Sequence, residues 1–198
     1  MQLKKLLPFL LIIILISTCA SIPDIHYYLV DYSLEPVSVQ DAKYQIVLGI
    51  EKFKTAPQYT GDRIVYRDSP FEVKFYNYHR WITAPRELVT EKTIEQFASS
   101  NLFKQVAPFP QVSKVNYLLR GTIKAFEEWD EGDEWFAHVK LHFKLLKAED
   151  NEIIWQGTVM KKTKVAQKKP VELVQSLGIS LRACIGEAID RVDRKLSR

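Results

Sequence analysis

The stretch WFAHVKLHFKL, residues 135–145, alternates apolar and polar side chains more clearly than any other part of the chain. Successive side chains of a β-strand point to opposite faces of the sheet, so this stretch has one apolar and one polar face. The apolar face consists of Trp135, Ala137, Val139, Leu141, Phe143 and Leu145. The pattern predicts a strand whose apolar face is buried in the core.

The segments on either side extend this strand to a three-stranded meander. Apolar residues alternate over residues 115–125, before the central strand, and again over residues 153–159, after it. Gly132 and the pair Asp150-Asn151 lie between the segments, in two acidic stretches that are typical of hairpin turns. We therefore expect two consecutive antiparallel hairpins.

Two helices are predicted outside the meander. The last begins at Pro170, and its apolar positions recur at spacings of three and four, as in a helix that lies on a sheet. These positions are Val174, Leu177, Leu181, Ile185, Ile189 and Val192. Thr83 and Pro85 indicate the start of the other helix. One face of that helix carries Val89, Thr93, Ile94 and Phe97.

Four shorter strands are expected nearer the N-terminus, over residues 27–32, 44–50, 63–67 and 71–78. In the last of these, Phe71 and Val73 share the apolar face with Phe75. Strands with one apolar face and two striped helices indicate two layers. We predict an α+β fold in a single domain of residues 27–198, with a mostly antiparallel sheet and both helices packed on one face.

The N-terminus predicts a targeting signal. Lys4 and Lys5 precede an apolar run over residues 6–16, which is shorter than the ~20 residues needed to cross a bilayer. Ile16-Ser17-Thr18 before Cys19 resembles a bacterial lipobox, although Gly, Ala or Ser is usual where Thr18 stands. We expect a signal peptide over residues 1–18, a lipid on Cys19 and a tether over residues 19–26. The alternative is ordinary cleavage after Ala20, which would give a soluble periplasmic protein.

Charge and composition exclude several classes of function. Without Lys4 and Lys5, the chain has 26 basic side chains against 24 acidic ones, a balance that does not favour nucleic acid. Its seven glycines form neither a phosphate-binding loop nor a dinucleotide fingerprint, and no G-x-S-x-G is present. We therefore expect no enzyme activity, no metal and no cofactor.

Three polar motifs and one cysteine have a structural and a functional reading. His138 and His142 would lie ~13 Å apart on a strand, too far to hold one metal ion, so solvated histidines are favoured. EEWDEGDEW, residues 127–135, is interpreted as a solvated hairpin tip rather than a calcium loop. KKTKVAQKKP, residues 161–170, is interpreted as a charged connection rather than a contact to lipid phosphates. Cys184 is expected to be a small apolar residue at the margin of the last helix's buried stripe rather than a reactive thiol.

Three segments carry a family resemblance: YYLVDY (residues 27–32), IVLGIEKFKTAPQYTGDRIVYR (46–67) and HRWITAPREL (79–88). They resemble ABC-type transport auxiliary lipoproteins, the PqiC-like group, in which an arginine-flanked strand is followed by an Arg-Trp pair that leads into the first helix. The matching positions here are Arg63, Ile64, Val65, Arg67, Arg80 and Trp81.

The resemblance implies a docking and scaffold protein in intermembrane lipid transport. It would be anchored in the outer membrane on the periplasmic side, consistent with Ala20 and Ser21 after the cysteine. Its partner would be a periplasmic Mce-type lipid-binding protein of an ABC transport system. The alternative is a lipoprotein that assembles or stabilises an envelope complex without lipid in transit. A homo-oligomer is left open by the sequence.

Five residues are expected to contact the partner, because aromatic residues and arginine are enriched among the energetic anchors of interfaces. They are Tyr76, Tyr78, Arg80, Trp81 and Trp129. For Arg80 and Trp81 the alternative is structural, with the ring packed at the entry to the first helix. For Trp129 the alternative is that the ring folds back onto its own strands.

Overall fold

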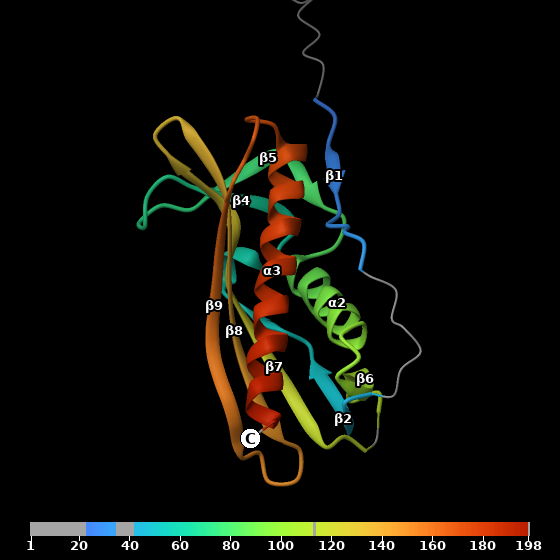
Figure 1. The fold of residues 1–198 in the computed structure, drawn as a ribbon. Helices are drawn as coiled ribbons and strands as arrows, with labels where there is room; N and C mark the ends of the chain where they lie inside the picture. The colour runs from blue at the N-terminus through green and yellow to red at the C-terminus, as the bar shows by residue number, and fades with distance from the viewer. Residues whose placement is uncertain (1–22, 35–41, 113, 198) are drawn as a thin grey trace, which may run out of the picture.

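The computed structural model describes residues 23–34, 42–112 and 114–197. The predicted signal peptide, Cys19 and the start of the tether lie outside these residues. Within them, nine strands form one sheet, accompanied by two α-helices and a short 3-10 helix (Figure 1). The elements in chain order are β1 (His26–Tyr28), β2 (Tyr44–Glu51), β3 (Lys54–Thr55), η1 (Pro57–Tyr59), β4 (Arg63–Arg67), β5 (Lys74–Trp81), α2 (Pro85–Ala98), β6 (Phe103–Phe109), β7 (Tyr117–Glu131), β8 (Glu134–Lys147), β9 (Ile153–Lys164) and α3 (Pro170–Leu196).

The predicted meander is confirmed as the longest part of the sheet. β7 pairs antiparallel with β8 over its whole length, and β8 pairs antiparallel with β9. Gly132 and Asn151 in the two turns have φ of +59° and +60°, in the left-handed region that Gly and Asn tolerate best. The alternating residues of β8 from Ala137 to Leu145 are fully buried, as their pattern predicts.

The other edge of β7 carries three parallel neighbours. β2 pairs with its beginning, β3 with its middle and β4 with its far end, while β6 extends the sheet beyond β2, and β5 and β1 extend it beyond β4. Five of the eight strand pairs are parallel, so the prediction of a mostly antiparallel sheet is wrong, although the α+β class is roughly right. The physical reason is that alternation reports which face is buried and not which strand lies alongside. Consecutive hairpins are local, whereas these parallel pairs join distant segments.

Three strand boundaries differ from the prediction. β1 covers only His26–Tyr28, and β6, which contains Pro108, was not predicted. β5 begins at Lys74 and extends to Trp81, so Arg80 and Trp81 belong to a strand. Phe71 is 95% exposed and Val73 is 38% exposed, so neither contributes to the buried face expected of them.

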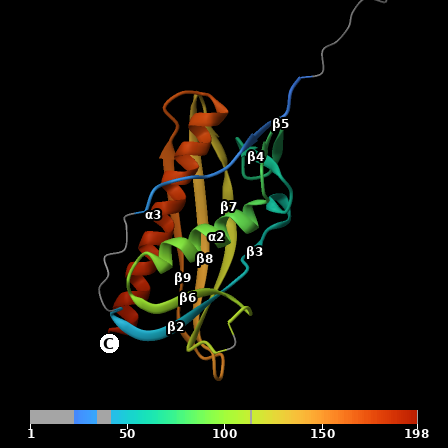
Figure 2. The same cartoon turned by 90° about the vertical axis from the view of Figure 1, so that its right-hand side faces the viewer.

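Both helices lie on the same side of the sheet (Figure 1). α3 runs along β8 and β9, while α2 crosses the direction of α3 and contacts β2 and β6 (Figure 2). Both helices begin with proline, whose missing N–H has no intrahelical partner at that position anyway. The apolar stripe of α3 faces the sheet, and its members from Leu177 to Val192 include several fully buried side chains. No helix among the described residues is long and apolar enough to span a membrane.

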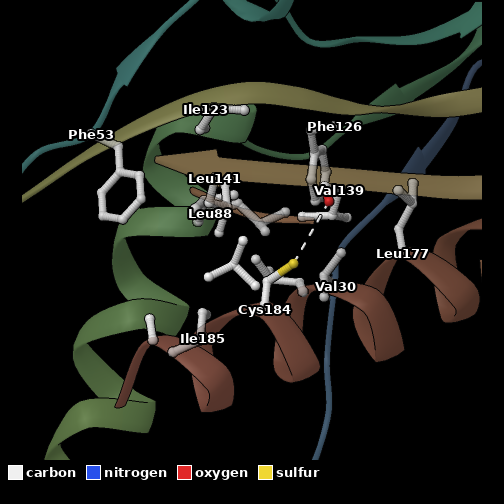
Figure 3. Close-up of a cluster of buried hydrophobic side chains, with 14 of the residues drawn as sticks. Val30, Phe53, Leu88, Ile123, Phe126, Val139, Leu141, Leu177, Cys184 and Ile185 are labelled. Atoms are coloured by element: carbon white, nitrogen blue, oxygen red, sulfur yellow. Dashed lines mark hydrogen bonds between the residues drawn. The ribbon is translucent and has the colours of Figure 1, made fainter. Parts of the chain in front are cut away.

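Buried side chains of the core pack against the middle of α3 (Figure 3). Cys184 is fully buried, its Sγ–H donates to the carbonyl oxygen of Val139 at 3.6 Å, and burial raises its pKa to about 12. The residue therefore lies in the core rather than at the predicted margin, and it stays protonated. Nearby, the ring of Phe53 covers Gly121, where an added Cβ would lie 2.1 Å from a ring carbon. Glycine is required there because the ring occupies the place of a side chain.

Candidate functional site

A β-bulge in β7 changes which side chains face the helices. Ile123 lies opposite Leu141, but Ala125 lies opposite Lys140, because Lys124 is the extra residue of the bulge. Beyond it, Glu128 lies opposite buried Ala137 on the helix side, and Glu127 lies opposite His138 on the other side. Both glutamates are 1% exposed. The prediction of a solvated hairpin tip over residues 127–135 is therefore wrong for these two residues.

The helix side of this region contains a cavity of about 410 Å³, which we call the aromatic cavity. It is bounded by β4, β5, β7 and β8. Its walls are mainly the rings of Tyr66, Phe75, Tyr76, Tyr78, His79 and Trp135. The carboxyl groups of Glu128 and Asp130 also line it. The cavity thus combines aromatic walls with two acidic groups.

Tyr76 connects the rings to the acids. Its hydroxyl donates to Oε2 of Glu128 at 2.8 Å, and its ring centroid lies 5.2 Å from that of Tyr66 and 5.4 Å from that of His79. His79 is held in turn by Tyr28, with 2.9 Å between the hydroxyl oxygen and Nδ1. Burial lowers the pKa of His79, so its ring is neutral at physiological pH. These contacts fix the ring positions without placing a positive charge next to Glu128.

The two carboxyl groups of the cavity both have raised pKa values. Burial raises the pKa of Glu128 to about 8, and the neighbouring Asp130 adds to the increase through a hydrogen bond and its charge. Burial also raises the pKa of Asp130. Oδ1 of Asp130 is buried and has no hydrogen-bond partner among the described residues. The pair therefore keeps its protons to a higher pH than ordinary carboxyl groups do.

Glu127, on the opposite face, has a complete set of partners, which we call the Glu127 cluster: Tyr59, Arg67, Trp129 and His138. The Tyr59 hydroxyl donates to Oε2 at 2.5 Å, His138 Nδ1 lies 3.2 Å from Oε1, and the Arg67 guanidinium lies 3.8 Å from it. Arg67 also lies over the ring of Trp129, 5.4 Å from its centroid. This carboxyl group is buried with donors around it, which is the arrangement that stabilises a buried acid.

The residues predicted to contact a partner lie in four different environments. Tyr76 and Tyr78 line the aromatic cavity, and Tyr78 is 42% exposed. Trp129 belongs to the Glu127 cluster on the other face, where its ring contacts Arg67 and His138. Arg80 pairs with Asp62 at 3.2 Å. Trp81 is 1% exposed, with its ring centroid 5.3 Å from that of Phe126, so it offers no surface to a partner and the packing alternative is supported.

A second exposed feature lies beside the cavity, along the edge strand β1. We call it the edge patch: Ile25, Tyr27, Leu29, Tyr78 and Ile82 are apolar side chains with exposed fractions between 42% and 60%. Ile25, Tyr27 and Leu29 alternate along the chain, and Tyr27 lies opposite Arg80 of β5. The patch therefore covers the end of the sheet where the described chain begins.

Sequence reasoning missed most of these positions. The acidic residues Glu128 and Asp130 were assigned to a turn, and Tyr27 was assigned to a strand without a role. One signal was available: the alternation over residues 115–125 fails directly afterwards, because apolar Phe126 follows apolar Ala125. Among the described residues, no group of three or more His, Cys, Asp or Glu side chains could hold a metal ion.

Comparison with known proteins gives one family and several related structures. The sequence model of the family described as ABC-type transport auxiliary lipoprotein component matches residues 28–185. Protein XCC0632 from Xanthomonas campestris superposes with a TM-score of 0.78 at 17% identity, over 87% of this chain and 97% of that one. CT253 from Chlamydia trachomatis superposes with a TM-score of 0.53 at 9% identity, over 75% of this chain and 96% of that one. At these identities the structures are similar in fold alone. No curated protein matches the chain in sequence.

Proposed function

The chain belongs to the family of ABC-type transport auxiliary lipoprotein components, and from this membership we propose that it is a tethered docking and scaffold module. Its partner is a periplasmic Mce-type lipid-binding protein whose ABC transporter lies in the inner membrane. Lipid passes between the membranes through that partner. The family description is that of a transport component rather than an enzyme, and it supports a role in binding.

The proposed anchor is a lipid on Cys19 that holds the protein at the periplasmic face of the outer membrane. Cys19 lies seven positions before His26, the first residue of β1. An extended chain spans at most about 3.5 Å per residue, so β1 would stand within roughly 25 Å of the lipid anchor. The edge patch would then stay close to the membrane.

The partner surface we propose is the edge patch together with Arg80, and this patch is the observation that carries the proposal. Its apolar side chains are exposed next to a strand whose outer backbone edge pairs with no other strand of the described residues. Aromatic residues and arginine at such a site are typical of binding anchors. Tyr78 and Arg80 remain proposed contacts, Tyr76 and Trp129 are proposed to support the rings around them, and Trp81 is proposed to pack beneath.

Photo-crosslinking in cells tests the docking surface. A photoreactive phenylalanine at Tyr27 should crosslink a periplasmic transport component, whereas the same residue at Met160, which is 55% exposed on β9, should not. Capture of outer-membrane assembly proteins from Tyr27 would favour the alternative, a lipoprotein that stabilises an envelope complex without lipid in transit. Equal capture from both positions would exclude the edge patch as the docking surface.

Labelling with a radioactive fatty acid tests the anchor separately. The wild-type chain should incorporate the label, and Cys19→Ala should not. The Cys19→Ala domain should keep its melting temperature, because the modified sulfur is on the tether. Equal labelling of both proteins would exclude lipidation at Cys19.

A further inference from the structure

The aromatic cavity contains an acidic pair that forms no ion pair with any described residue. Glu128 is 1% exposed, and its hydrogen-bond partner is the neutral hydroxyl of Tyr76. Oδ1 of Asp130 is buried and has no hydrogen-bond partner among the described residues. The matched position on the other face, Glu127, has the guanidinium of Arg67 within 4 Å. Lys168 acts on both acids of the cavity and Lys74 acts on Asp130, but neither ammonium group lies within ion-pair distance of them.

The walls of the cavity suit a cation on a carbon chain. Aromatic faces attract ammonium groups, and Tyr66, Tyr76 and Trp135 surround the acidic pair. The chain itself places such groups on two of these rings. Lys168 Nζ lies 5.8 Å from the centroid of Trp135, and Lys74 Nζ lies 6.0 Å from that of Tyr66. A volume of about 410 Å³ is within the range of small-molecule sites.

The rim offers one positive charge for an anionic group. Lys74 is engaged by Asp68 at 2.7 Å and by Glu72 at 3.3 Å. Lys168, which lies two positions before the first residue of α3, makes no ion pair with any described residue. A ligand with a positive end for the acids and a negative group a few bonds away would satisfy both sites.

We propose that the aromatic cavity binds a zwitterionic aminoalkyl phosphate of the phosphoethanolamine type, with its ammonium group at Glu128 and Asp130 and its phosphate at Lys168. The same chemistry occurs in a phospholipid head group and in the free head group. The proposal goes beyond the docking function and does not depend on it, because it requires only this chain.

Binding should be linked to proton release. An ammonium group beside Glu128 favours its ionised form, so the proton of Glu128 leaves as the ligand enters. The other titratable or charged groups that act on this pair are Tyr76 from β5, Lys168 before α3, Asp68 after β4 and Lys74 at the start of β5. Affinity should rise with pH up to about 8, where Glu128 ionises without the ligand.

Isothermal titration calorimetry on the full chain in a non-ionic detergent tests the proposal. Glycerophosphoethanolamine should bind, and glycerophosphate, which lacks the amine, should not. Titrations in two buffers of different ionisation enthalpy should show release of protons at pH 7. Glu128→Gln and Asp130→Asn should each weaken binding roughly tenfold or more, since each removes a charged partner. Glu128→Gln should also abolish the proton release.

The control is Asp133→Asn, an exposed acid in the same hairpin, which should bind as the wild type does. Melting temperatures separate lost binding from lost folding. Vesicles with phosphatidylethanolamine that compete with the soluble ligand would assign the lipid as source, and vesicles that do not compete would assign the free head group. Equal affinities of the wild type and Asp130→Asn, or no binding of glycerophosphoethanolamine, would overturn the proposal. Tighter binding of a lysine-containing peptide than of glycerophosphoethanolamine would also overturn the proposal, because the cavity would then bind a lysine side chain of a partner protein.

Discussion

Two neighbouring glutamates of β7 are equally buried and have opposite environments. Glu127 accepts a hydrogen bond from Tyr59 and lies near Arg67 and His138, whereas Glu128 has Tyr76 and a second acid, Asp130. Both side chains are 1% exposed. Burial alone therefore does not decide the state of an acid; its partners do.

The difference shows that the fold uses the carboxyl group of Glu127 for its own stability and leaves the carboxyl group of Glu128 available to a ligand. On the side of Glu127, the donors around the carboxylate form a network that is complete without a ligand. On the side of Glu128, burial and the neighbouring Asp130 raise the pKa of the carboxyl group. Positions that break local rules in this way are often functional. The predictions below test this contrast, from the largest expected effect to the smallest.

Removing the buried ring of Trp81 should have the largest effect. Trp81 is 1% exposed and packs against Phe126, which directly precedes Glu127. Trp81→Ala should lower the free energy of unfolding by about 3–5 kcal/mol, as is typical for the loss of a buried aromatic side chain. Urea unfolding would measure it. Ile82→Ala is the control, because Ile82 is 60% exposed and the change should stay within about 0.5 kcal/mol. Equal stability of the two variants would contradict the packing role.

Glu127→Gln should be the next largest change. The carboxylate accepts on both oxygens, whereas the amide has only one acceptor oxygen and its NH2 group cannot accept a hydrogen bond. The change also leaves Arg67 without its buried countercharge. We expect a loss of about 1–3 kcal/mol in the free energy of unfolding at pH 7. Asp133→Asn, an exposed acid of the same hairpin, should change stability little. If Glu127→Gln were as stable as the wild type, the Glu127 cluster would not be a stabilising network.

The sequence predicted the parts of the fold that depend on local pattern. Apolar alternation gave the meander, and the stripe after Pro170 gave α3 from its first residue. The parallel partners of β7 were not predicted, because β2, β3 and β4 reach it across long stretches of chain. Alternation contains no information about these contacts.

The candidate site was harder to predict for a related reason. An acidic run beside Gly132 is typical of a solvated turn, and only the bulge at Lys124 places Glu128 toward the helices. Its burial also needs Tyr76, which lies 52 positions away in the chain. Tyr78 and Trp81 were both among the five residues predicted to contact a partner. Tyr78 is exposed, whereas Trp81 is buried.

Glu128→Gln should change the pH dependence of stability. The pKa of Glu128 rises from its ordinary 4.5 to about 8 on folding. Between these values the folded state binds more protons than the unfolded state, so this group makes the wild type less stable as pH rises. The glutamine lacks this effect, so the stability of Glu128→Gln relative to the wild type should increase from pH 5 to pH 8 and then level off.

Urea unfolding of both proteins at intervals from pH 5 to pH 9 would measure this difference. Asp130, whose pKa is also raised by burial, acts in the same direction and remains in both proteins. Because Glu128 acts on the pKa of Asp130, the comparison measures Glu128 together with its effect on Asp130. Parallel stability curves for the two proteins would mean that Glu128 is ionised in the folded state, and the contrast with Glu127 would fail.

Tyr78→Ala should have the smallest effect on stability and should separate the two exposed features. Tyr78 lines the aromatic cavity and also belongs to the edge patch, and it is 42% exposed, so its loss should cost at most about 1 kcal/mol in unfolding. Tyr27→Ala is the matched variant, because Tyr27 is 56% exposed and belongs to the edge patch without lining the cavity.

If the edge patch binds the partner, both variants should weaken capture of the periplasmic component from detergent extracts, by roughly tenfold each. If the cavity binds it instead, Tyr78→Ala and Glu128→Gln should weaken capture while Tyr27→Ala leaves it unchanged. Undiminished capture in all three would place the docking surface elsewhere on the molecule.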